Sequence, residues 1–302
     1  MKVSNADRVV YPDDGITKGE VVAYYEAATE RMLPFVAGRA LSVERFPKGI
    51  GEKGFMQKNA PDHFTDDLIT RTEVPKEDGG FTEYPVIAAP EAIAAFANLG
   101  VITFHVPPSM VDDEDRPDWA IWDLDPPQGE SALVRNAAVQ MRELLQDFDI
   151  ETVLMTSGSN GYHLRARLMR SADAGTVARV ARGTAALASA AHPDELTLAF
   201  RKSERGDRVF VDWLRNAPYS TSVVPWSLRA RAGAPVATPL SWDELGQIDP
   251  DGVRIEHALE RLSTTDPWSD IPEHDFTTVA ESVDAALDEA GIELVPFDRF
   301  RS

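Results

Sequence analysis

The sequence of 302 residues contains no cysteine, which excludes disulfide bonds and thiolate metal sites. It also lacks any apolar run near the roughly 20 residues that a membrane-spanning helix needs. The first 15 residues, MKVSNADRVVYPDDG, have no continuous apolar segment of the kind that secretory signals carry. We therefore expect a cytoplasmic protein without a membrane partner.

Positive charge is also scarce, because 30 Lys and Arg residues face 50 Asp and Glu residues and leave a net charge of −20. That balance argues against a nucleic-acid partner, but the charges are unevenly distributed. Residues 240–302 hold 16 acidic and 4 basic residues, whereas residues 201–231 hold 7 basic and 3 acidic, and residues 39–58 hold 5 basic and 2 acidic. Two basic segments are thus available for phosphates, although a solvated, salt-bridged surface is the commoner explanation for each one alone.

Hydrophobic residues make up 43% of the chain, enough for a substantial core in one large domain or two small ones. The pattern predicts a mixed α and β fold. Thr17 and Glu20 form a capping-box pattern, and Gly291 is a plausible helix stop. Helical spacing marks residues 15–33, 131–148, 174–192 and 279–290. Strand character marks residues 101–106, 119–125, 151–157, 161–168 and 207–214.

The stretch WAIWDLDPP, residues 119–127, is an apolar strand that ends in Asp123 and Asp125. Carboxylates avoid the interior unless something positive compensates them. Residues two apart on a strand face the same side, so both carboxylates would converge on one point. A hard cation such as magnesium or manganese fits that arrangement. A strand end followed by a solvated Asp turn explains the stretch equally well.

Two further stretches bear on the same question. TSGSNGYH, residues 156–163, allows a tight glycine turn whose amides can face an anion, with Ser157 and His163 as donors. RVFVDWLRN places Asp212 after an apolar strand. A hairpin turn and a local Asp turn explain each alone. Together, three strand-end carboxylates, an anion turn and nearby arginines favour metal-dependent phosphoryl or nucleotidyl transfer.

The order DxD, SGxxGxH and a strand ending in Asp is that of the archaeo-eukaryotic primase superfamily. NADRVVYP, GITKGEVVAYY, GFMQKNAP, PDWAIWDLDP, SGSNGYHL, VFVDWLRN and SLRARAGAPVATPLSWDEL resemble the polymerase domain of bacterial DNA ligase D and its stand-alone relatives. The resemblance runs from about residue 3 to at least residue 245. It implies a single α/β (α+β) primase-polymerase catalytic domain over residues 1–302. Two β-sheets with flanking helices would form an active-site cleft, with possible lobes at about 1–110 and 111–302.

The resemblance also implies roles for individual residues. Asp123, Asp125 and Asp212 would be the catalytic carboxylates that hold two Mg²⁺ or Mn²⁺ ions, with NTP or dNTP as substrate. The nucleotide-binding residues would be Ser157, His163, Arg229, His105 and Asn160. Asn5, Arg8 and Lys18 would hold a DNA 5′-phosphate at a helix start. Phe55 would stack on a template base, and Lys58 would contact a backbone phosphate. Arg45 would supply the positive charge that some relatives carry at position 44. Arg205 would lie near the primer terminus.

This family pattern predicts a template-directed DNA-repair polymerase that fills short gaps, or gaps at joining ends, with a preference for ribonucleotides. Its partners would be gapped DNA with a 5′-phosphate, nucleoside triphosphates and a separate DNA ligase or end-joining factor. We expect a monomer that associates with the nucleoid during non-homologous end joining or excision repair. The alternatives are a primase-like or general primer-extension enzyme and a non-catalytic DNA-end-binding module.

The chain departs from the family pattern at three positions. Many relatives have a second aromatic residue where this chain has Met56, and a methionine stacks less well on a base. Many have Lys where this chain has Asn160, whose neutral amide adds no charge. Some have a basic residue where this chain has Glu44. These departures affect the expected nucleotide and template contacts and leave the carboxylates intact. A phosphatase with a nucleophilic DxD is disfavoured because the motif lies mid-chain and Pro126 follows it.

Overall fold

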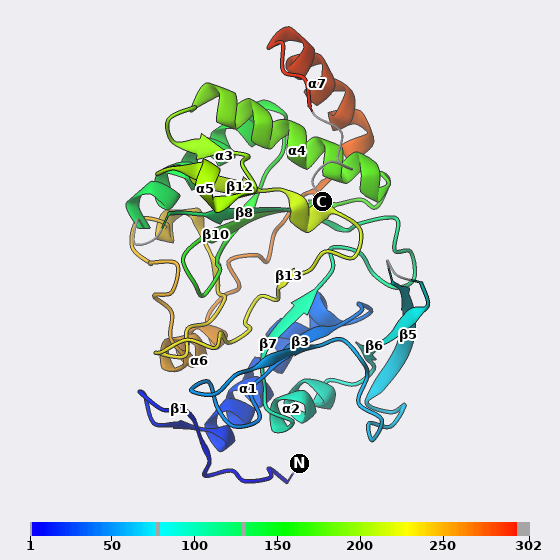
Figure 1. Cartoon of the computed structure of the whole chain (residues 1–302), viewed down its shortest axis with the longest axis vertical. Coiled ribbons are helices and arrows are strands. Elements are labelled where there is room, and N and C mark those ends of the chain that lie inside the picture. The colour runs from blue at the N-terminus through cyan, green and yellow to red at the C-terminus, as the bar shows by residue number, and fades with distance from the viewer. Residues whose placement is uncertain (1, 77–78, 128–130, 295–302) are drawn as a thin grey trace.

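The computed structural model describes residues 2–76, 79–127 and 131–294 of the chain. Its centre is a seven-stranded sheet in the order β11-β12-β8-β10-β9-β14, with β15 paired to β10 (Figure 1). The strands are β8 (Trp119–Asp125), β9 (Val153–Thr156), β10 (Tyr162–Leu168), β11 (Leu196–Thr197), β12 (Val209–Asp212), β14 (Pro239–Leu240) and β15 (Glu273–His274). β8 is antiparallel to both β10 and β12.

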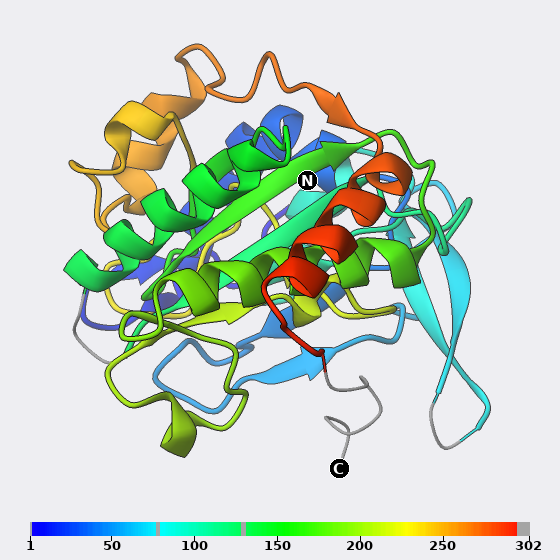
Figure 2. The ribbon, with the colours of Figure 1, turned by 90° about the horizontal axis from the view of Figure 1, so that it is seen from above.

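Three helices cover one face of this sheet: α3 (Ser131–Asp147), α4 (Ala174–Ala191) and α7 (Phe276–Glu289). Seen from above, α3 and α4 lie side by side over the sheet, and α7 crosses over α4 (Figure 2). The side chain of Asp173 caps α4 by accepting from the Thr176 amide. Gly183 lets α7 approach α4, because a Cβ at that position would lie 2.5 Å from Val283. The apolar stripes of these helices therefore form one core with the sheet.

A second, four-stranded sheet has the order β13-β7-β3-β4. Its strands are β3 (Ser42–Arg45), β4 (Phe55–Gln57), β7 (Val101–Val106) and β13 (Ser222–Val223), and its helices are α1 (Lys18–Val36), α2 (Glu91–Asn98) and α6 (Ile255–Leu262). The predicted capping box is present, with Thr17 and Glu20 bonded reciprocally at the start of α1. Tyr24 and Tyr25 of this helix are buried and donate to backbone carbonyls. α1 is thereby fixed against the second sheet.

The remaining elements connect or extend these two layers. β1 (Val9–Tyr11) pairs with β2 (Ile16–Thr17), and β5 (Ile69–Pro75) pairs with β6 (Phe81–Ile87) in a hairpin at the side of the molecule (Figure 1). Short helical segments are α5 (Lys202–Arg205), η1 (Leu214–Asn216) and η2 (Trp242–Glu244). The core of the second sheet also takes in residues between Val224 and Ala258, so the chain returns to this sheet after it has formed most of the first. The division at about residue 110 stays a prediction.

The two sheets are joined by an apolar cluster and a buried ion cluster. Trp119 and Ile121 of β8 pack with Val223 of β13 and with Trp268. Beside them, Arg39 donates to Asp118 at 2.5 Å and Arg167 donates to the same oxygen at 2.8 Å. The predicted mixed fold of two sheets with flanking helices is confirmed. Within the described residues, every helix is too short or too polar to cross a membrane.

Candidate active site

Three carboxylates lie where the last residues of β8 pair with β12. Asp212 is directly opposite Asp123 in the antiparallel pairing, and Asp125 follows two residues later on β8. Asp123 and Asp212 are 8% and 5% exposed, and both accept from Arg215, at 3.1 Å and 3.0 Å respectively. The strand register therefore brings the three side chains to one edge of the cleft, as their spacing predicts.

Positive groups surround these carboxylates. His163 of β10 is the cross-strand neighbour of Asp123, and its Nε2 lies 3.2 Å from Oδ1 of that residue. Burial alone would raise the pKa of Asp123, but His163 and Arg215 outweigh it and hold that pKa below its usual range. Asp125 behaves oppositely, because burial and the charges of Asp123 and Asp212 raise its pKa to about 7. At Asp125, burial and the neighbouring carboxylates therefore outweigh the nearby arginines.

The donor set suits a hard divalent cation. Carboxylate oxygens are the ligands that Mg²⁺ and Mn²⁺ prefer, and a guanidinium already bridges Asp123 and Asp212, so the two carboxylates accept a shared cation. In the described part of the chain, no three His, Asp or Glu side chains are close enough together to hold one ion in this arrangement. Asp125 is paired instead with Arg205, at 3.9 Å. The three carboxylates fit divalent ions once Arg205 and Arg215 move away from them.

The glycine turn between β9 and β10 lies beside the carboxylates. The Ser157 hydroxyl accepts from the amides of Ser159 and Gly161, at 3.1 Å and 3.2 Å. Arg229 donates to the Ser157 carbonyl at 2.8 Å. A Cβ on Gly161 would lie 1.9 Å from the Leu124 carbonyl oxygen, so only glycine fits against β8. This close approach fixes the turn to the strand that carries Asp123 and Asp125.

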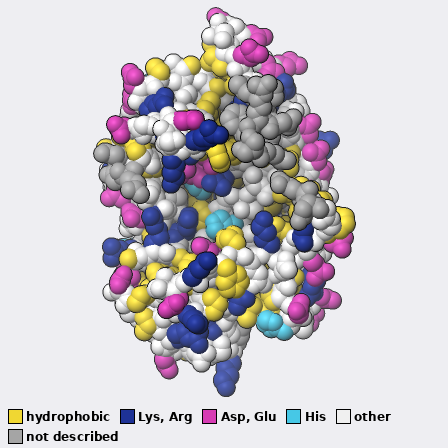
Figure 3. Space-filling model, in the orientation of Figure 1, with side chains coloured by type: hydrophobic (Ala, Val, Ile, Leu, Met, Phe, Trp, Pro, Cys, Tyr) yellow, Lys and Arg dark blue, Asp and Glu magenta, His cyan; other side chains and the backbone are white. Residues whose placement is uncertain are grey.

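Two cavities open at this point between the sheets. One of about 240 Å³ is lined by twelve residues that include Asp123, Asp125, Ser157, Asn160, His163 and Arg229. The other, of about 90 Å³, joins His105 of β7 to Asp123 and His163. Burial and nearby Arg229 lower the pKa of His105 to about 3, so its ring is neutral. A space-filling view shows a hollow in which basic, acidic and histidine side chains gather (Figure 3).

The residues expected at the 5′-phosphate also lie together, at the start of α1. Lys18 is 6% exposed, and its Nζ donates to the carbonyl and the hydroxyl of Ser4, each at 2.7 Å. Its backbone amide donates to Arg8, and the Arg8 amide donates to Asn5. Burial and the Arg8 charge lower the pKa of Lys18. The loop thus folds Asn5 and Arg8 over a buried lysine.

The other expected DNA contacts are more dispersed. Phe55 is 49% exposed and Lys58 is exposed on the same segment. Arg45 lies over the Phe55 ring at 5.5 Å and donates to the Leu99 carbonyl and to Gln57. Its guanidinium is therefore used within the protein. Arg205 stacks on Phe210 at 3.9 Å and faces Asp125, at the rim of the larger cavity.

Sequence reasoning missed three basic residues of the site. Arg215 bridges two carboxylates, and Lys202 lines the cavity of about 240 Å³. Arg231 donates to Ser159 and, at 2.9 Å, to Asn160, so a cation reaches the turn from another segment. The spacing of Arg215, three residues after Asp212, was a signal that could have found it. The other two positions depend on tertiary packing.

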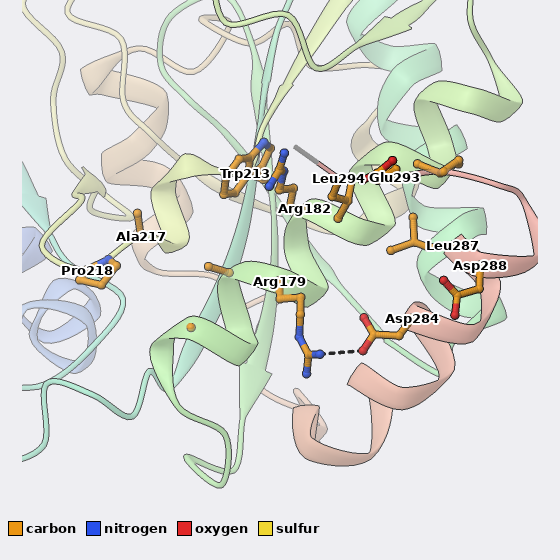
Figure 4. Close-up of a pocket in the computed structure, with 13 residues that line it drawn as sticks. Arg179, Arg182, Trp213, Ala217, Pro218, Asp284, Leu287, Asp288, Glu293 and Leu294 are labelled. Carbon is orange, nitrogen blue, oxygen red and sulfur yellow. Dashed lines mark hydrogen bonds and ion pairs between the residues drawn. The ribbon is translucent and has the colours of Figure 1, made fainter. Parts of the chain in front are cut away.

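A larger cavity of about 680 Å³ lies elsewhere, between α4, α7 and Trp213 (Figure 4). Its labelled residues include the surface ion pair of Arg179 and Asp284, at 2.6 Å. Trp213 belongs to the core on the helix-covered face of the sheet, whereas its neighbour Asp212 faces the cleft. Volume therefore does not identify the chemical site; the converging charges do.

A family model described as the LigD primase-polymerase domain matches residues 17–268. The chain belongs to this family. The chain is also similar to the polymerase domain of Mycobacterium tuberculosis ligase D, solved in complex with DNA, with a TM-score of 0.81 and 31% identity. That match covers 87% of this chain and 94% of the other. The predicted family, and with it the predicted class of nucleotidyltransferase, is confirmed.

Two curated relatives extend the comparison. The multifunctional non-homologous end joining protein LigD of Mycolicibacterium smegmatis is 34% identical over 269 residues, which cover 87% of this chain and 34% of that protein. The bifunctional non-homologous end joining protein LigD of Bacillus subtilis is 27% identical over 267 residues, covering 87% and 42%. The chain therefore spans about a third of the length of the first relative. It corresponds to the LigD polymerase domain of these repair proteins.

Proposed function

We propose that this chain is a template-directed polymerase that fills short gaps in broken or gapped DNA by two-metal nucleotidyl transfer. The observation that carries the proposal is the convergence of Asp123, Asp125 and Asp212 beside a glycine turn with Ser157 and His163. Carboxylates and an anion-binding turn are the two halves of a site for a metal-bound triphosphate. The LigD relatives, named as end-joining proteins, support a role in that pathway.

The metal ions would be held by Asp123, Asp125 and Asp212. When bound, they lower the pKa of the primer hydroxyl and neutralise the triphosphate charge. Ser157 accepts from two turn amides, which fixes the shape of the turn, and its own O–H would donate to a phosphate oxygen. Arg229 supplies a charge-assisted donor in the same cavity, and His163 supplies an imidazole N–H. Asn160 adds an amide there, and Arg231 adds the positive charge that Asn160 lacks.

The small cavity beside His105 supports a preference for ribonucleotides. It is about 90 Å³ and joins His105 to the carboxylate site. The Nδ1 atom of His105 is buried and has no hydrogen-bond partner among the described residues. A sugar 2′-hydroxyl is a group of the right size to supply that partner, and its absence in a dNTP would leave the atom unpaired.

DNA is the proposed polymeric substrate, and the solved relative, which is in complex with DNA, supports this choice. Lys18, Arg8 and Asn5 gather at the start of α1, where the helix dipole also favours an anion. A terminal 5′-phosphate carries more charge than an internal phosphodiester, so such a pocket selects a gap. Phe55, Met56 and Lys58 form an exposed edge at β4 for the template, and Arg205 lies at the cavity rim for the primer.

Primer extension on a short gap with a 5′-phosphate, in the presence of Mn²⁺ and ATP, tests this function. Asp123→Asn should lower the rate at least about a thousandfold, because it removes a metal ligand while the same gap still binds. The matched control is Asp284→Asn, which removes a carboxylate from the distant ion pair with Arg179 and should extend normally. Normal extension by Asp123→Asn would reject the two-metal site. Binding without any extension by the parent would favour a DNA-end-binding module.

A further inference from the structure

Arg215 is held in the carboxylate site by the fold around it. The residue lies in η1, which follows β12 directly. Its neighbour Asn216 is fully buried, accepts from the Ile121 amide at 2.8 Å and donates to the carbonyls of Ile121 and Trp213. These bonds fasten the backbone of η1 to β8. The guanidinium is therefore directed at Asp123 and Asp212 by a rigid support.

The side chain itself is less confined than its backbone. Its Nε and Nη2 atoms contact Asp123 and Asp212, but Nη1 makes only a long bond of 3.4 Å to the Thr221 carbonyl. The side chain is 37% exposed and lines both active-site cavities. A guanidinium that left the carboxylates would thus remain among the residues of the nucleotide site, next to Arg229.

We propose that Arg215 is a cation that the site exchanges: it neutralises Asp123 and Asp212 while no metal ion is bound, and it turns to the phosphates of the nucleotide when a divalent ion takes its place. The inference rests on the proposed function, because it assumes that metal and triphosphate share this cavity. A guanidinium and a divalent ion cannot occupy the same gap between two carboxylates without strong repulsion. A planar guanidinium also suits phosphate oxygens.

The exchange predicts effects of opposite sign for two ligands. Arg215→Gln should bind Mn²⁺ alone at least about tenfold more tightly than the parent, because the ion no longer competes with a resident cation. The same variant should bind ATP at saturating Mn²⁺ about fivefold to tenfold more weakly, because one phosphate donor is lost. A residue with a purely structural role would weaken both ligands together.

The experiment titrates Mn²⁺ by electron paramagnetic resonance without nucleotide, and ATP at saturating Mn²⁺ by calorimetry. Arg215→Lys, which keeps the charge but cannot bridge two carboxylates in the same way, should fall between the parent and Arg215→Gln for Mn²⁺. It also keeps the test decisive if the Gln variant fails to fold. Arg179→Gln, which breaks a distant surface ion pair, should match the parent in both titrations.

Equal or weaker Mn²⁺ binding by both Arg215 variants would overturn the exchange and leave the proposed polymerase site standing, provided that Asp123→Asn loses the Mn²⁺ bound by the parent. Absence of Mn²⁺ binding in the parent and in all variants would instead overturn the proposed metal site and the exchange with it. Tighter Mn²⁺ binding with weaker ATP binding supports the exchange.

Discussion

Two charge clusters lie at opposite ends of β8, and they use the same kinds of side chain differently. At the start of the strand, Asp118 is 1% exposed and faces Arg39 and Arg167, with Arg165 buried nearby on β10. At the end of the strand, Asp123 and its two partner carboxylates face Arg215. In the first cluster Arg39 and Arg167 share the single carboxylate of Asp118, whereas in the second three carboxylates lie close together, with Arg205 and Arg215 as ion-pair partners.

The difference lies in access. Arg39 is 2% exposed and bridges the first lobe to Asp118, while Arg165 and Arg167 lie over the Trp119 ring at 4.9 Å and 5.3 Å. Asp118, Arg39 and Arg165 are sealed between the sheets, and Arg167 closes the edge of the cluster with a third of its side chain exposed. The second cluster opens into cavities of about 240 Å³ and 90 Å³. A sealed cluster stabilises the fold, whereas an open one can exchange its partners for ligands.

The largest effect is expected from Asp118→Ala. The change leaves Arg39 and Arg165 buried without a carboxylate, and breaking a buried pair by removing one partner costs about 3–5 kcal/mol. Urea unfolding of the metal-free protein should show this loss. Asp125→Ala is the matched control on the same strand: burial and the charges of Asp123 and Asp212 raise the pKa of Asp125 to about 7, so the change relieves repulsion and should leave the free energy of unfolding equal or higher. Equal losses in both variants would erase the distinction between the clusters.

Gly161→Ala tests how the open cluster is attached to its strand. The new Cβ would lie 1.9 Å from the Leu124 carbonyl oxygen, so β8 or the turn must shift. We expect a loss of about 3 kcal/mol in the free energy of unfolding, the upper end for overpacking, together with weaker ATP binding. Gly246→Ala, whose Cβ would have no neighbour within 4 Å, is the control and should be neutral in both measurements.

Much of the carboxylate cluster at the end of β8 was predictable from local sequence. The alternation that puts Asp123 and Asp125 on one face is a property of any strand, and the capping box of Thr17 and Glu20 depends on four consecutive residues. The strand at 101–106 and the helix stop at Gly291, which has a φ of +65°, were also predictable from local patterns. Family motifs then supplied candidates such as His105 and Arg229, whose roles stay predictions.

The rest depends on contacts between distant segments. Arg231 reaches the turn of Asn160 across 71 positions, and Arg39 meets Asp118 across 79. No periodicity or motif carries such a pairing. The sheet partner β13, which has only two residues, is too short for a pattern and forms because β7 offers it an edge. Sealed and open clusters look alike in sequence, because burial is decided only when the sheets meet.

Arg229→Ala should have a smaller effect, confined to the nucleotide. A charge-assisted contact with phosphate is worth roughly 1.5–3 kcal/mol, or about tenfold to a hundredfold in the ATP concentration for half-maximal extension. Arg229 also donates to the Ser157 carbonyl, so part of the loss is a looser turn. Arg231→Ala, an exposed residue that touches Ser159 and Asn160, should cost less. Overlapping titrations of Arg229→Ala and the parent would reject the pocket.

The smallest effect is expected at Lys18, which combines both kinds of environment. Like the sealed cluster, it is buried, with 6% exposure and two bonds to Ser4. Like the carboxylates at the end of β8, it has a neighbour of its own charge, which is Arg8. Burial and the charge of Arg8 lower the pKa of Lys18. A 5′-phosphate would relieve that repulsion, so the parent should bind a gap with a 5′-phosphate about fivefold to tenfold more tightly than the same gap with a 5′-hydroxyl.

Lys18→Ala should lose most of that preference while binding the 5′-hydroxyl gap as the parent does. Lys76→Ala removes the same charge from an exposed position just after β5 and should keep the preference. Fluorescence anisotropy with both gaps at one salt concentration measures the difference, because phosphate contacts weaken with salt. If the parent binds the two gaps equally, Lys18 belongs with the sealed cations that only support the fold, and the enzyme extends primers without sensing the far side of the gap.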